Sequence, residues 1–75
     1  MKFETLTTIL NDMYFNSEKG EAVAMIHLFG IKYAKEIQKC DESMKQFAIS
    51  SGLNESYGTE ISKGVKLAQF VWPKP

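Results

Sequence analysis

The stretch that decides the fold is Ser43–Ile61, SMKQFAISSGLNESYGTEI. Ser43 and Gln46 fit a capping box, in which the serine accepts a hydrogen bond from the third helical amide and the glutamine reaches back. Gly52 supplies the left-handed backbone conformation that commonly ends a helix. The stretch therefore predicts a short helix that starts at Ser43, a glycine turn, and a second helix that follows the turn.

The residues after Asn54 predict a final helix that ends before Pro73. Asn54 and Ser56 are both suitable N-cap residues for it. Its apolar residues recur every three or four positions, which places them on one helical face: Tyr57, Ile61, Val65, Ala68 and Val71. The region from Ser43 to Val71 is thus expected to fold back as two helices joined at Gly52.

Two further helices are predicted upstream, over about residues 3–15 and 20–39, where apolar residues recur at helical spacing. Gly30 lies inside the second segment. It either permits a close helix crossing or divides the segment into two shorter helices, and both alternatives stand. The expected fold class is therefore all-α: a single domain over residues 1–75 with four helices, or five if the chain breaks at Gly30. A chain this short has one core.

Composition indicates an ordinary folded domain, because 44% of the residues are hydrophobic and 24% are charged. Cys40 is the only cysteine, so no internal disulfide can form and a reducing, cytoplasmic compartment is expected. The N-terminus has no unbroken apolar stretch of the secretory type, and no run approaches the length of a membrane span. We therefore expect a cytoplasmic protein that does not interact with membranes.

The sequence offers no constellation typical of catalysis. His27 and Cys40 would lie roughly 20 Å apart on an unbroken helix, too far for a base and nucleophile. One histidine and one cysteine are also too few for a zinc site, and no carboxylate pair or glycine-rich phosphate loop accompanies them. We expect no enzyme activity, no metal, no cofactor and no small-molecule substrate.

From Met44 to Ile61 the chain resembles the helix-turn-helix signature of bacterial and phage DNA-binding proteins. Ala48 is small where the two helices would cross, and Gly52 stands at the turn. Three apolar residues would lock the helices together: Phe47, Leu53 and Ile61. Gly58 stands where a branched apolar residue is usual, and Ser51 where an apolar residue is common. These departures predict a longer turn or a shifted second helix.

The whole chain is also similar to small bacterial helix-turn-helix-like domains of unassigned function, in the segments LFGIKYA (residues 28–34) and YGTEI (residues 57–61). The resemblance implies that the start of the final helix enters the major groove of DNA. Its exposed polar residues would contact DNA: Asn54, Ser56, Thr59, Glu60, Ser62, Lys63, Lys66 and Gln69. Phosphate contacts are expected from Lys32, Lys35, Lys39 and Lys45. Gly58 and Gly64 would allow close backbone approach to the duplex. The alternative for these polar residues is the solvated face of an amphipathic helix.

Net charge argues against a strong DNA binder. Nine lysines balance nine acids, no arginine is present, and residues 32–75 hold seven lysines against five acids. Because duplex affinity comes largely from neutralising phosphates, double-stranded DNA would be bound well only by a homodimer or a larger assembly. The alternative is a protein–protein interaction or dimerisation module that binds no nucleic acid and buries Tyr57, Phe70 or Trp72 against a partner. We expect Phe70, Trp72 and the Pro73–Pro75 tail to fold back over the core as a lid.

Overall fold

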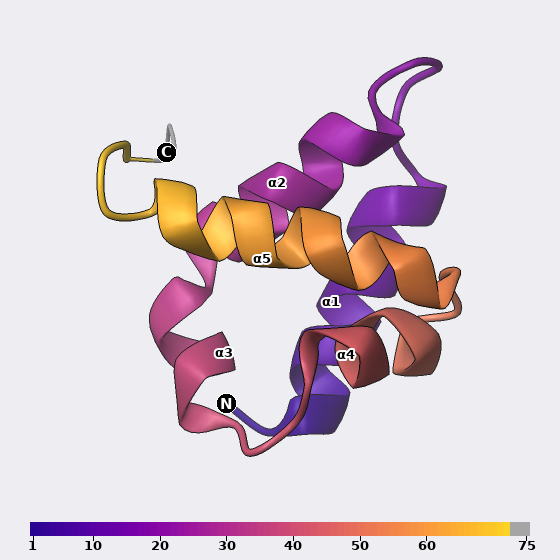
Figure 1. Cartoon of the computed structure of the whole chain (residues 1–75). Coiled ribbons are helices and arrows are strands. Elements are labelled where there is room, and N and C mark those ends of the chain that lie inside the picture. The colour runs from indigo at the N-terminus through magenta and orange to yellow at the C-terminus, as the bar shows by residue number, and fades with distance from the viewer. Residues whose placement is uncertain (73–75) are drawn as a thin grey trace.

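A computed structural model describes residues 1–72, which consist of helices and the segments that connect them (Figure 1). The elements in chain order are α1 (Phe3–Phe15), α2 (Ala22–Lys32), α3 (Ala34–Lys39), α4 (Met44–Ser50), the 3-10 turn η1 (Glu55–Tyr57) and α5 (Gly58–Leu67). The predicted all-α class is confirmed, and the first helix occupies the predicted range. Across residues 1–72, every helix is too short or too polar to cross a bilayer.

The core lies between α1, α2, α4 and α5, and α3 contributes Ala34 and Ile37 to it. The fully buried side chains are Leu6, Leu10, Ile26, Phe29, Ile37, Phe47, Ala48 and Ile61. The Phe3 ring packs edge-on against the Phe47 ring, with 4.8 Å between centroids. These contacts join the first helix of the chain to α4, so residues far apart in the sequence close the same core.

The closest contact between two helices is the one between α2 and α5, where α5 crosses over α2 (Figure 1). A Cβ atom on Gly30 would lie 2.7 Å from the Ile61 carbonyl oxygen and 2.8 Å from the Gly64 Cα. A Cβ on Gly64 would lie 2.5 Å from the His27 carbonyl oxygen. Of the two alternatives for Gly30, the close crossing is therefore correct. The other alternative, a break at Gly30, is wrong, because α2 continues through it.

The predicted helix over residues 20–39 is nevertheless divided, at Tyr33. This residue has φ −114° and ψ 20°, outside the helical range, and it separates α2 from α3. Ala34 and Ile37 are buried beyond it, so the apolar pattern continues through the bend. Because no glycine or proline stands at position 33, the sequence gives no sign of the break.

The last helix is shorter than predicted. It ends at Leu67, and a turn follows in which the Phe70 and Val71 amides both donate to the Leu67 carbonyl. Phe70 is 79% exposed and Trp72 is 94% exposed. The predicted lid is therefore wrong for these two side chains, because the chain turns away once α5 has ended. The rest of the predicted lid, Pro73–Pro75, lies outside the described residues.

Candidate nucleic-acid interface

The α4 helix begins with the predicted serine cap. The backbone amide of Gln46 donates to Ser43 Oγ at 3.0 Å, which satisfies one of the free backbone amides at the start of the helix. The other half of the predicted capping box, in which the Gln46 side chain reaches back to Ser43, is wrong. The Gln46 side chain instead donates to Ser50 Oγ, one turn further along the same helix, at 2.8 Å.

The turn after α4 is a Schellman motif centred on Gly52, whose φ is +83°. The Leu53 amide donates to the Ala48 carbonyl at 2.9 Å, and the Gly52 amide donates to the Ile49 carbonyl at 3.0 Å. These bonds satisfy two of the last carbonyls of α4. The glycine corner was correctly predicted from the sequence.

Ser51, a departure from the helix-turn-helix signature, is buried and fully bonded. Its hydroxyl donates to the Phe47 carbonyl at 2.7 Å, and its carbonyl accepts from Asn11 Nδ2 at 2.9 Å. A serine is therefore accommodated where an apolar residue is common, because its polar atom has a partner inside the fold. The second bond also ties the turn to α1.

Gly58, the other departure, lies against the start of α4. A Cβ at this position would meet the Lys45 amide nitrogen and the Met44 carbonyl carbon at 2.9 Å, so a branched residue cannot fit here. Of the two predicted alternatives, the structure has the longer connection: residues 51–54 are followed by η1, whose Ser56 backbone amide donates to Asn54 Oδ1 at 2.9 Å. The expectation that Gly58 and Gly64 approach DNA is wrong. Both are buried against this protein's own backbone.

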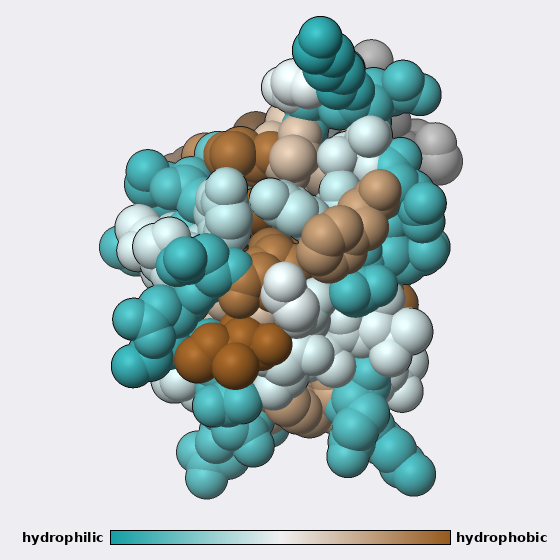
Figure 2. All heavy atoms as spheres, turned by 90° about the vertical axis from the view of Figure 1, so that its right-hand side faces the viewer, coloured by the Kyte–Doolittle hydropathy of each residue, from teal (hydrophilic) through white to brown (hydrophobic). Residues whose placement is uncertain are grey.

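The α5 helix presents two different faces. Gly58, Ile61 and Gly64 are buried and point inward. Polar residues occupy the opposite side, and we call them the outer face: Thr59, Ser62, Lys63 and Lys66. Next to the outer face is an open groove between the start of α4, η1 and the first turns of α5, lined in part by Lys45, Asn54 and Ser56. Figure 2 shows the side of the molecule at which α5 begins, where hydrophilic atoms surround separate apolar patches.

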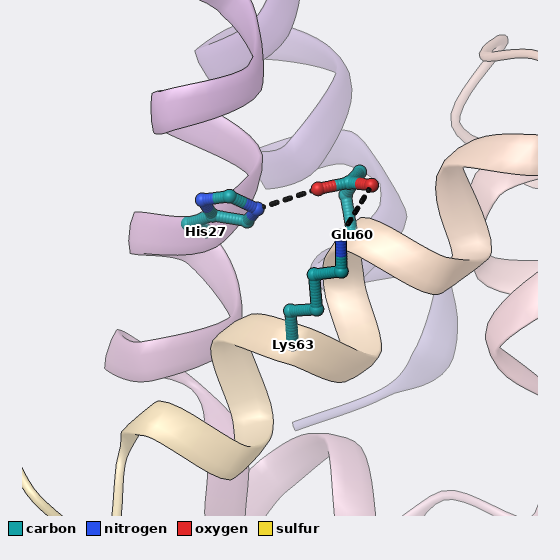
Figure 3. A network of polar contacts seen from close by, with 3 residues as sticks. All are labelled: His27, Glu60 and Lys63. Carbon is teal, nitrogen blue, oxygen red and sulfur yellow. Dashed lines mark hydrogen bonds and ion pairs between the residues drawn. The ribbon is translucent and has the colours of Figure 1, made fainter.

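Glu60 lies at the edge of the outer face and is bound to α2. Its Oε1 accepts a hydrogen bond from His27 Nε2 at 2.7 Å, and its Oε2 pairs with Lys63 Nζ at 3.3 Å (Figure 3). Because a carboxylate can only accept, His27 Nε2 carries the hydrogen. The hydrogen bond from His27, followed by the contact with Lys63, holds the pKa of Glu60 below its ordinary value. Sequence reasoning did not pair these residues, which are 33 positions apart.

The remaining predicted site residues fall into two groups. Lys45 pairs with Glu55 at 3.5 Å beside the groove, whereas Lys66 forms no ion pair with any residue from 1 to 72. Lys32, Lys35 and Lys39 lie on α2 and α3, and Lys39 pairs with Glu36 at 3.7 Å. Gln69 is exposed in the turn that follows α5. The structure therefore gathers the residues from Asn54 to Lys66, with Lys45, and places the α2–α3 lysines elsewhere.

Residues 2–74 match a family described as an HTH-like domain. The chain belongs to the HTH-like domain family. No curated protein and no solved structure matches the sequence. HTH-like domains are typically non-enzymatic. Within residues 1–72, this HTH-like domain groups no three side chains of the His, Cys, Asp or Glu type around a common point.

Proposed function

We propose that this HTH-like domain is a cytoplasmic DNA-binding module in which the outer face of α5 enters the major groove. The observation that carries the proposal is the division of α5 into two faces. Its inner face, with Gly30 of α2 packed against Gly64, holds the helix against the core. The outer face and the adjoining groove are left polar and accessible at the helix start, the part that contacts base edges in helix-turn-helix proteins.

The side chains of the outer face have suitable chemistry for this contact. The hydroxyl groups of Thr59 and Ser62, and that of Ser56 in the adjoining groove, both donate and accept hydrogen bonds, so they can pair with base edges of either kind. The ammonium groups of Lys63 and Lys66 can contact guanine or phosphate, and that of Lys45 lies across the groove. Asn54 and Gln69 flank the surface with amide groups. Glu60 would act mainly by holding Lys63 in place.

The ion pairs on this surface do not prevent phosphate binding. Lys45 and its partner Glu55 are both more than half exposed, and exposed pairs of this kind contribute about 0–1 kcal/mol, so a phosphate can replace Glu55 at little cost. Lys63 is also more than half exposed and can contact a phosphate while it stays beside Glu60. Three available lysines would give a slope of about −3 for the logarithm of affinity against that of salt concentration. Binding by one copy is therefore expected to be weak and strongly salt-dependent.

The proposal is tested by NMR titration of the labelled protein with a duplex of mixed sequence at low and at physiological salt. We expect shifts confined to residues 54–69 and the groove, and smaller at the higher salt. Lys66→Ala should reduce the slope of the salt dependence by about one, because one phosphate contact is removed. Lys19→Ala, an exposed lysine in the α1–α2 connection, is the matched control and should leave the slope unchanged. Absence of shifts at low salt would refute DNA binding.

A second candidate is a protein-interaction module, and the exposure of Phe70 and Trp72 favours it. Two large aromatic side chains that are both exposed, two positions apart in the sequence, are typical of residues that become buried in an interface. Tyr57, which was grouped with them, is already used within the fold, because its ring lies 5.7 Å from that of Tyr14. The interaction surface would therefore lie at the C-terminal end of α5.

A further inference from the structure

We infer that the segment Leu67–Trp72, called here the C-terminal segment, and the pocket beside it form a self-complementary surface through which two copies of this chain pair. The inference gives the protein-interaction candidate a specific partner, a second copy. It requires no nucleic acid and holds or fails independently of DNA binding. It also gives a role to the LFGIKYA stretch, whose last residues line the pocket.

The pocket exists because α2 bends into α3 at Tyr33. It has a volume of about 390 Å³ and lies between the residues of the bend, 31–36, and the C-terminal segment. Ile31, Tyr33 and Ala34 provide apolar surface, and Lys32 and Lys35 bring ammonium groups to it. The pocket is therefore apolar with a cationic border.

The C-terminal segment offers side chains that match this pocket. Phe70 and Trp72 are 79% and 94% exposed, and Leu67 and Val71 are each more than two-fifths exposed. Lys32 Nζ already lies 5.8 Å from the centre of the Tyr33 ring, at the outer limit of a cation–π contact. Tryptophan is the best aromatic partner for such a cation. The partner's Trp72, on entering the pocket, would present its face to Lys32 and Lys35.

The area available agrees with a dimer. The two aromatic side chains expose about 300–400 Å² per chain, given the surface that such residues usually bury. In a two-fold arrangement each copy supplies both rings and the pocket that covers the other copy's rings. The rings of the two copies would then bury about 600–800 Å² together, and the surface that covers them adds to this, which places the pairing among small, weak interfaces of less than about 1,200 Å². A second copy is thus sufficient to cover the exposed rings of both chains.

The charges give the pairing a distinctive salt dependence. Glu36, the acid at the pocket, is held by the N-terminal ammonium at 2.7 Å and by Lys39 at 3.7 Å. Pairing would therefore bring Lys32 and Lys35 of the two copies towards one another with little compensation. Because salt screens this repulsion, the dimer should be strengthened as salt rises. An acidic protein partner at the same surface would show the opposite dependence.

Trp72 is the only tryptophan of the chain, so its fluorescence reports on this surface directly. The test measures the mass of the full chain by sedimentation and the Trp72 emission maximum, from about 1 µM to about 1 mM. We expect the mass to double and the emission maximum to move to shorter wavelength over the same range of protein concentration. When salt is raised, both changes should occur at lower protein concentrations. Phe70→Ser should weaken pairing by about tenfold or more, and Trp72→Ser should weaken the mass change similarly.

Phe15→Ser is the matched control, because it removes another exposed ring, at the end of α1, and should leave the pairing unchanged. Circular dichroism of each variant establishes that it is folded. A single-chain mass throughout the range would overturn the inference. The inference would also be overturned by a dimer that forms without a change in the Trp72 emission, that forms equally well in Phe70→Ser, or that becomes weaker as salt rises.

Discussion

Gly30 and Gly64 lie against each other where α2 and α5 cross, and a methyl group on either would meet backbone atoms. Backbone cannot move aside as a flexible side chain can, so added volume must separate the two helices. The same crossing carries the His27–Glu60 hydrogen bond, which joins α2 to α5 at the surface. These few atoms therefore fix where α5 lies relative to the core.

Gly30→Ala should lower the free energy of unfolding by about 1–3 kcal/mol, the usual cost of overpacking a tight contact. At an exposed helical site the same substitution would stabilise the protein by about 1 kcal/mol, because alanine is the better helix former. Urea unfolding followed by circular dichroism measures the difference. An increase in stability of Gly30→Ala would contradict the close crossing.

The lowered pKa of Glu60 predicts a pH dependence of stability. A carboxyl whose pKa is depressed in the folded protein contributes stability in full above its ordinary value of 4.5, and loses that contribution as pH falls through the lower folded value. Glu60→Gln should therefore be less stable than the parent near neutral pH, and should lose less stability on acidification.

The measurement is the free energy of unfolding at a series of pH values from about 6 to about 2, the range in which carboxyl groups titrate. Glu18→Gln, at an exposed position in the α1–α2 connection, is the matched control and should follow the parent curve. If Glu60→Gln and the parent lose the same stability between these limits, the hydrogen bond from His27 does not act as described.

Residue roles were predictable from the sequence only where they depend on near neighbours. The cap at Ser43 and the left-handed Gly52 follow from local chemistry, and both were correctly predicted. Glu60 is predicted among the exposed polar residues of the final helix, because helical spacing places it off the apolar stripe. Its partner His27 comes from another helix, and no spacing rule connects the two.

The short helix α4 depends on its cap more than a long helix would. It has seven residues, and such a segment is only marginally helical without tertiary contacts and satisfied end groups. Ser43→Ala should therefore lower the free energy of unfolding by about 0.5–2 kcal/mol. Ser50→Ala, which removes an exposed side-chain bond in the last turn of α4, should change it by less than about 0.5 kcal/mol. Equal effects of the two variants would contradict the importance of the cap.

Element boundaries differ in how far the sequence specifies them. α1 and the α4–α5 turn are marked by apolar spacing, a capping serine and a glycine, and the predictions for them hold. The division of α2 from α3 has no such mark, because the apolar pattern passes through Tyr33 unchanged. The end of α5 has none either: Val71 continues the spacing of three and four, yet the helical bonds stop at Leu67 and a tighter turn follows.

At the scale of the whole molecule, the two proposed surfaces are centred at opposite ends of α5, and Gln69 lies where they meet. The groove and outer face begin at Gly58, and the C-terminal segment starts at Leu67. A helix of this length spans about 15 Å, so two copies joined at their C-terminal segments could hold the starts of their α5 helices about 30 Å apart. This distance is close to the separation of about 34 Å between half-sites one DNA turn apart. The two proposals are therefore geometrically compatible.

Pairing would also compensate for the neutral net charge of the chain, from which weak binding of DNA by a single copy is predicted. Two copies on one duplex would offer twice as many outer-face lysines. Composition alone indicated this deficit, but it could not locate a dimer surface. The exposure of Phe70 and Trp72 is what supports the proposed one. The sequence did not predict this exposure, because an aromatic residue near the end of the chain is equally consistent with a covering role over the core.

The separation of the two faces of α5 has a consequence for how such a domain can change its ligand preference. The residues that anchor the helix, Gly58, Ile61 and Gly64, share no position with those that it presents to its surroundings. A library randomised at Thr59, Ser62 and Lys66 should therefore retain folded members with many different surfaces. The side chains that this helix presents can therefore be replaced one at a time without changing those that support it.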